Sequence, residues 1–152
     1  MPDYCFEMGH AAIDAGADMI IGSHTHILKG IEMYKGKPIF YSVGNFALEL
    51  GPHMRDHKHV NILDKLYRIK DWHDRRKTVI AKAIIEDGKI SRVSYIPCYE
   101  RDDKEPETLK REDPRAQDVF DYVADISKSE GINTRFEWEG DEVLVMPQVA
   151  DK

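Results

Sequence analysis

Two histidines separated by one residue offer the clearest chemistry in this 152-residue chain. His24 and His26 follow an apolar run, Met19–Ile21, that predicts a short buried strand ending at Gly22. Imidazoles at i and i+2 just beyond such a strand can turn their nitrogens toward one point, where a divalent ion could bind. Neutral imidazole is the commonest side-chain metal ligand, because it binds without adding charge. The alternative is a pair of loop histidines bonded to nearby carbonyl groups, and the spacing alone favours that alternative.

The elements around the pair are those that would hold such a loop in an α/β protein. Residues 3–15 carry apolar side chains at helical spacing, and Gly16 predicts the end of that helix. After the pair, residues 30–34 and 38–42 predict two strands of a hairpin around a glycine turn at 35–37. The order is helix, strand and loop, and α/β proteins place ligands at the C-terminal ends of strands.

The remainder of the chain predicts further hairpins and one more helix. We first expect a polar surface excursion over 51–77 with a short helix near 62–69, and then a hairpin over 78–97 with the turn Asp87-Gly88. A charged loop over 99–113 follows. The chain then continues with a helix from Pro114 to about Gly131 and a hairpin over 135–145.

Composition excludes several classes of protein. The chain is 41% hydrophobic and 33% charged, as expected for a globular domain with its own core. Its net charge of −6 argues against a nucleic-acid-binding protein, which needs a basic face. No apolar run approaches the roughly 20 residues that cross a bilayer, and no secretion signal is evident, so the location stays open between cytoplasm and cell envelope. Cys5 and Cys98 are interpreted as reduced packing residues.

A longer pattern surrounds the histidine pair. Residues 15–26, 30–32 and 34–46 together resemble the CapA family of bacterial capsule and poly-γ-glutamate synthesis proteins. That family is similar to calcineurin-like metallophosphoesterases, in which a late glycine-histidine-x-histidine motif supplies metal ligands. The resemblance implies an α/β fold, namely the C-terminal part of a metallophosphoesterase-like α/β sandwich with β-hairpins and two main helices. We therefore expect one partial domain over 1–152, organised as 1–50, 51–77 and 78–146.

The resemblance also implies a role for the histidine pair and a need for other metal ligands. His24 and His26 would be metal ligands, and the complete domain would hold divalent ions (Mn, Zn or Fe), two of them close together. The family's other ligands come from upstream strands, and nothing before Gly22 offers them. Hard divalent ions normally need carboxylates as well, so the chain alone should bind metal weakly or not at all.

Three further residues could support the pair. Glu32 could orient a histidine from behind, or it could be a solvated strand glutamate, and the sequence favours neither. Ser42 and Asn45 flank a bend after the second strand of the hairpin. They could hydrogen-bond substrate or fix the loop, but for Asn45 a bond to its own backbone turn is the favoured interpretation.

The other histidines and one basic run are weaker candidates. His53, His57 and His59 form a second cluster in a polar segment, which ranks below the first pair, whereas His10 and His73 are interpreted as structural. The basic run Arg75-Arg76-Lys77 could meet an anionic substrate, although a solvated entrance to a strand is the favoured interpretation.

Three hypotheses for function follow from these observations. The first is a metal-dependent hydrolase of the metallophosphoesterase type, acting on phosphoester bonds or an anionic polymer. The second is a non-catalytic component of capsule or poly-γ-glutamate assembly that binds an acidic polymer. The third is an inactive fragment that lacks its upstream metal ligands. An apolar strand edge at Met19–Ile21 would then be left uncovered, which predicts self-association or pairing with a missing N-terminal half.

Overall fold

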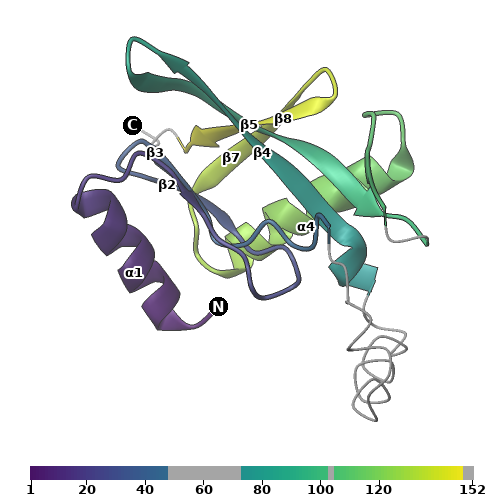
Figure 1. The fold of residues 1–152 in the computed structure, drawn as a ribbon, viewed down its shortest axis with the longest axis horizontal. Coiled ribbons are helices and arrows are strands. Elements are labelled where there is room, and N and C mark those ends of the chain that lie inside the picture. The colour runs from purple at the N-terminus through teal and green to yellow at the C-terminus, as the bar shows by residue number, and fades with distance from the viewer. Residues whose placement is uncertain (48–72, 103–104, 149–152) are drawn as a thin grey trace.

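The computed structural model describes residues 1–47, 73–102 and 105–148. These residues form two β-sheets and two main helices, which confirms the predicted α/β fold with hairpins (Figure 1). Most of the predicted surface excursion, with its short helix near 62–69 and the cluster His53, His57 and His59, lies outside the described residues.

The smaller sheet carries the first helix and the histidine loop. Its strand order is β1-β3-β2: β1 (Ile20–Ile21) runs parallel to β3 (Lys37–Phe40), and β2 (Ile31–Tyr34) runs antiparallel to β3. The helix α1 (Asp3–Asp14) leads into β1, and it lies beside the β2–β3 hairpin (Figure 1). The predicted order of helix, strand, histidine loop and hairpin is therefore confirmed.

A glycine ends α1 as the sequence predicts. Gly16 has a φ of +112°, a left-handed conformation that costs other residues free energy. This conformation lets Ala17 N–H donate to Ala12 O at 3.0 Å and Gly16 N–H donate to Ile13 O at 3.0 Å. The two bonds satisfy carbonyl groups that the last turn of a helix would otherwise leave unpaired.

The prediction that Met19–Ile21 is a buried strand was wrong about burial: β1 covers Ile20–Ile21, and none of the three side chains is fully buried. Ile21 is 58% exposed, and Ile20 is half-buried. Within the described part of the chain, β1 pairs only with β3, so it lies at the edge of its sheet. An edge strand has neighbours on one side only, and an apolar side chain there can stay uncovered.

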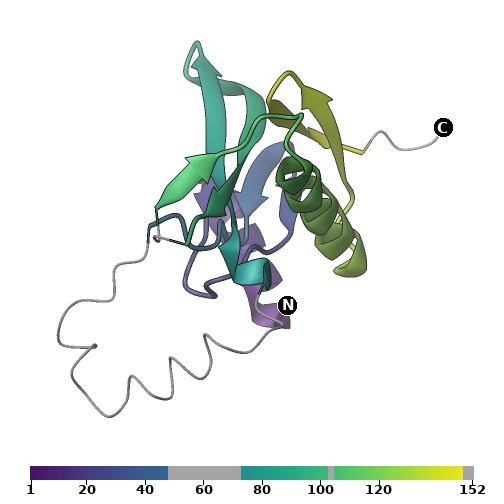
Figure 2. The same cartoon turned by 90° about the vertical axis from the view of Figure 1, so that its right-hand side faces the viewer.

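The larger sheet is built from the two later hairpins. Its order is β4 (Lys77–Glu86), β5 (Lys89–Glu100), β8 (Glu142–Pro147) and β7 (Thr134–Glu139). Asp87 and Gly88 have positive φ angles of 50° and 75°, as the tight turn of a two-residue hairpin requires. The β4–β5 hairpin projects beyond the rest of the molecule in both views (Figures 1 and 2).

The predicted charged loop over 99–113 contains a strand. β5 continues to Glu100, and β6 (Pro106–Thr108) pairs antiparallel with it. Leu109 follows β6, is buried, and donates its N–H to Pro97 O at 2.9 Å. The prediction was wrong because charged side chains alone favour a loop. Here backbone pairing with β5 and the buried side chain of Leu109 hold the segment in place.

The second helix completes the core between the two sheets. α4 (Pro114–Ser129) is capped at its N-terminus by Asp113, whose side chain accepts the N–H of Arg115 at 2.9 Å. Its apolar stripe packs inward, as predicted, into one cluster of buried side chains drawn from both sheets: Leu28, Ile31, Phe40, Val79, Val93, Tyr95, Leu109, Ala116, Val119, Val123, Val143 and Val145. No helix among the described residues is long and apolar enough to cross a membrane.

The loop after β3 is fastened to the larger sheet. Val43 O accepts the hydroxyl of Thr78 at 2.7 Å and the N–H of Val79 at 3.4 Å. Val43 also forms a β-bridge with Leu28, just after the histidine pair. The segment that faces the histidine loop is thus held from both sheets.

Both cysteines are free thiols, in agreement with the prediction. Cys98 is buried, and burial raises the pKa of its thiol to about 11, although a bond from the backbone of Ile80 opposes the shift. The thiolate is the reactive form of cysteine, so Cys98 is inert at neutral pH and serves packing.

The position of Gly22 leads to the first prediction. A Cβ atom at Gly22 would lie 2.3 Å from Tyr41 O, a contact that requires the backbone to move. We expect Gly22→Ala to lower the free energy of unfolding by about 1–3 kcal/mol, as overpacking does, measured by urea denaturation. Gly88→Asn is the control, because Gly88 has open space around it and asparagine tolerates its positive φ. An unchanged midpoint for Gly22→Ala would contradict the close packing at this site.

Candidate metal site

The histidine pair lies in a loop with an unusual backbone. Residues 23–26 follow the C-terminal end of β1, and both imidazoles are exposed. His24 has a φ of 84° and His26 a φ of 60°. For residues with a Cβ atom, this left-handed conformation costs roughly 1–2 kcal/mol each. Such strained positions are found preferentially at functional sites, where the surrounding structure holds them.

Asn45 holds His26 with two hydrogen bonds. His26 Nδ1 lies 2.7 Å from Asn45 Oδ1, and Asn45 Nδ2 donates to the backbone carbonyl of His26 at 3.1 Å. The carbonyl can only accept, so the amide nitrogen must face it and the amide oxygen must face the ring. His26 Nδ1 therefore carries the proton, and the lone pair of Nε2 is left for another partner.

This arrangement corrects the interpretation of Asn45. The favoured prediction was a bond to its own turn, but the amide group uses both ends on His26. Asn45 is only 6% exposed. It fixes the loop and sets the tautomer of the ring, as the supporting partners of metal-binding histidines do.

Ser42 also fixes the loop. Its hydroxyl oxygen lies 3.0 Å from Thr25 Oγ1 and accepts the N–H of Gly44 at 3.3 Å. Since Ser42 is only 1% exposed, a substrate cannot reach it. Thr25 was not among the predicted site residues. The sequence feature that could have indicated a role for Thr25 is its place between the two histidines.

Glu32 orients a histidine, but the histidine is His10. The Glu32 carboxylate lies 2.9 and 3.0 Å from His10 Nε2 and accepts the hydroxyl of Tyr41 at 2.5 Å. Burial, followed by the bond to Glu32, raises the pKa of Tyr41. The His10 ring stacks on Tyr34 with centroids 3.8 Å apart. Glu32 therefore supports a histidine outside the His24–His26 pair. Its contact with His10 joins α1 to β2, and the structural role predicted for His10 is confirmed.

The basic run is largely buried rather than solvated. Its three side chains all form ion pairs: Arg75 with Glu100, Arg76 with Asp102, and Lys77 with Asp74 and Asp118. Burial alone would lower the pKa of Lys77, but the bonds to its two aspartates outweigh burial and raise it. The favoured interpretation as a solvated strand entrance was wrong for Arg75 and Lys77, which are both buried. These pairs fix the start of β4.

The separation of the two imidazole rings limits how they could share a metal ion. Their ring centroids are 6.4 Å apart, with the planes tilted by 42°. A ring centre lies about 3.2 Å from a zinc ion bound to its nitrogen, so 6.4 Å is roughly the upper limit for one shared ion. Two ions about 3.5–4 Å apart would match the separation more easily. Among residues 1–47, 73–102 and 105–148, no group of three or more His, Cys, Asp or Glu could hold a metal.

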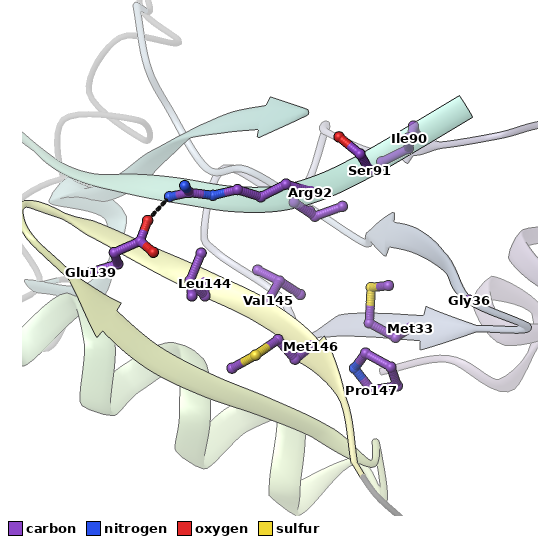
Figure 3. Close-up of a pocket in the computed structure, with 11 residues that line it drawn as sticks. Met33, Gly36, Ile90, Ser91, Arg92, Glu139, Leu144, Val145, Met146 and Pro147 are labelled. Atoms are coloured by element: carbon purple, nitrogen blue, oxygen red, sulfur yellow. Dashed lines mark ion pairs between the residues drawn. The ribbon is translucent and has the colours of Figure 1, made fainter. Parts of the chain in front are cut away.

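A separate groove lies between the two sheets. It has a volume of about 380 Å³, and Figure 3 shows its mostly apolar lining from β2, β5 and β8, including Met33, Ile90, Leu144 and Met146. The strands β5 and β8 pair at only two positions, Ser94 with Leu144 and Tyr95 with Val143. The groove carries one ion pair, Arg92 with Glu139, and none of its lining residues belongs to the histidine loop.

The N-terminal third of the chain is similar to a known family of proteins. Residues 1–49 match the model of the family described as bacterial capsule synthesis protein PGA_cap. These residues are therefore similar to that family over about a third of the chain. The match contains α1, the histidine loop and the β2–β3 hairpin, so the predicted CapA resemblance is confirmed for the segment that carries the candidate site.

Curated relatives agree over the same length of chain. The chain is 51% identical over 45 residues to the PGA biosynthesis protein CapA of Bacillus subtilis (strain 168), covering 30% of this chain and 12% of the relative. It is 48% identical over 44 residues to the capsule biosynthesis protein CapA of Bacillus anthracis, covering 29% and 11%. A probable polyglutamine synthesis accessory protein of Mycobacterium tuberculosis is 50% identical over 36 residues, covering 24% and 10%. The matched stretch thus spans about one tenth of these relatives.

The bond between His26 and Asn45 leads to the second prediction. In the intact protein we expect the proton of neutral His26 on Nδ1, because the amide oxygen accepts it. Asn45→Ala removes this acceptor and should move the proton toward Nε2. Long-range ¹H–¹⁵N correlation spectra of the imidazole rings at alkaline pH distinguish the two tautomers. His10, which has other partners, is the internal control. The same tautomer of His26 in both proteins would contradict the assignment.

Proposed function

We propose that this chain supplies the histidine end of a divalent-metal centre in a CapA-type protein of capsule or poly-γ-glutamate synthesis. His24 and His26 are the ligands contributed by this segment. Carboxylates of the kind that the family's upstream strands supply would complete the centre, because two neutral ligands do not balance a divalent charge. The observation that carries the proposal is the bond from His26 Nδ1 to Asn45, which leaves Nε2 free on an exposed loop.

The proposed chemistry is hydrolysis of a phosphoester or of an anionic polymer. Mn²⁺, Zn²⁺ or Fe²⁺ ions in such a centre polarise a phosphoryl or carbonyl oxygen and lower the pKa of bound water. The protein's own contribution would be to hold two imidazoles in place and to fix the tautomer of one. The names of the relatives support a role in making an acidic polymer. Metal ions would offset the net charge of −6 where an anionic chain approaches.

Metal binding by the purified chain tests the first step. We expect weak binding of Zn²⁺ or Mn²⁺, measured by competition with a chelating dye. His24→Ala and His26→Ala should each weaken it by at least about tenfold, since each removes a direct ligand. The matched control replaces His53, His57 and His59 with alanine. Binding that survives the first two substitutions but is lost in the control would contradict the proposal.

Catalysis requires a separate experiment with the same variants. Mn²⁺-dependent cleavage of a chromogenic phosphodiester that is abolished in both histidine variants would support the hydrolase, and we expect it only where carboxylate ligands complete the centre. Retention of poly-γ-glutamate that is unaffected by metal, with no cleavage, would instead favour a non-catalytic polymer-binding component.

The exposed edge of β1 supports a proposal about assembly. β1 presents one unpaired edge within the described residues, and Ile21 is exposed on it. On α1, Tyr4 and Met8 are also exposed and stand one helical turn apart. An unpaired strand edge that carries an exposed apolar side chain favours pairing with a further strand. That strand comes from a second copy of the chain or from a separate N-terminal part of the same domain.

Self-association of the isolated chain is the corresponding prediction. We expect light scattering after size exclusion to give a mass above that of one chain. Ile21→Lys should shift the protein toward the monomer, because a charge on a strand edge opposes pairing. Ile85→Lys is the control, since Ile85 is 68% exposed at the tip of the β4–β5 hairpin. A monomer that melts cooperatively without any substitution would contradict this proposal.

A further inference from the structure

We infer that Thr25 is the positioning residue of the histidine pair, acting through Ser42 to set the conformation of both His24 and His26. Only the expected effect of Thr25 on metal affinity rests on the proposed function. The arrangement itself is visible without metal. Thr25 stands between the two histidines, and its side chain is anchored to a buried residue of another segment.

The hydroxyl groups form a chain with a defined direction. Thr25 Oγ1 lies 2.9 Å from Ile27 O and 3.0 Å from Ser42 Oγ. A hydroxyl has one proton, and Ile27 O can only accept, so Thr25 donates to Ile27 O and accepts the proton of Ser42. Ser42 Oγ in turn accepts the N–H of Gly44. The chain therefore runs from Gly44 through Ser42 and Thr25 to Ile27, with every proton used once.

The buried end of this chain does not move easily. Ser42 is 1% exposed and directly precedes Val43, which is bonded to β4 and bridged to Leu28. Loss of the Thr25 hydroxyl would leave a buried serine without one of its partners, which is unfavourable. The position of Thr25 is consequently set by the sheet and not by solvent.

Thr25 acts on both histidines because it is joined to both. Asn45 bonds the ring and carbonyl of His26 alone. His24 and His26 both hold left-handed backbones, which are unfavourable for residues with a Cβ atom. An anchored side chain between them compensates for this cost, and it fixes the two backbone turns that set the separation of the rings. Without it, both residues can return to ordinary backbone conformations.

The test compares three substitutions with one control. Thr25→Val keeps the shape of the side chain and loses the hydroxyl, Thr25→Ser keeps the hydroxyl, and Ser42→Ala removes the buried partner. Thr108→Val is the matched control, on an exposed position of β6 in the other sheet. Thermal unfolding of each variant confirms that the domain is folded before the loop is measured.

Two measurements are then made on each protein. In metal-free protein, the three-bond N–H to Hα couplings of His24 and His26 report φ. With Zn²⁺, competition with a chelating dye gives affinity. We expect Thr25→Val and Ser42→Ala to change both couplings and to weaken Zn²⁺ binding by about tenfold, as loss of a supporting partner does. Thr25→Ser should restore both values, and Thr108→Val should change neither.

Unchanged couplings in Thr25→Val would overturn the inference, whatever happens to the affinity. Changed couplings with restoration by Thr25→Ser support it, even if the unsubstituted chain binds no Zn²⁺. In that last case the proposed metal centre fails while the positioning role of Thr25 stands.

Discussion

The pairing of β1 with β3 is the constraint on which the candidate site depends. The two strands run parallel, so their C-terminal ends lie side by side. Gly22 extends the pairing past β1: its N–H donates to Phe40 O at 2.7 Å, and its carbonyl accepts the N–H of Val43 at 3.1 Å. Each strand is then followed by a loop, and the two loops must meet. The histidines come from one loop and their supporting groups come from the other.

This constraint explains why the supporting residues are polar and buried. Ser42 and Asn45 follow β3 directly, where the backbone is held by β1 on one side and by β4 beyond it. Their side chains satisfy groups of the histidine loop, which has left-handed residues and no strand pairing of its own. The sheet therefore holds Ser42 and Asn45 in place, and these two side chains hold the loop that carries the exposed imidazole rings. The buried side chains of Ser42 and Asn45 thus order the exposed histidine loop.

Much of this architecture could be predicted from the sequence. The glycine at 16, the Asp87-Gly88 turn and the Pro114 helix start have local causes, and each was predicted correctly. The partner of Glu32 was not predictable, because nothing local indicates that the helix places His10 against β2. The same limit applies to Arg75 and Lys77, whose burial depends on Glu100 and Asp118 far along the chain. Local patterns determined the elements, and contacts distant in sequence determined which polar groups became buried.

We propose that the His24–His26 loop presents two prearranged imidazole nitrogens to a metal ion. Anomalous diffraction from crystals of the chain grown with Zn²⁺, collected on both sides of the absorption edge, tests it most directly. We expect a zinc peak within about 2.0–2.1 Å of Nε2 of His26, with His24 bound to the same ion or to a close neighbour, and with the Asn45 bond intact. Zinc bound elsewhere on the chain while both rings stay unligated would contradict it.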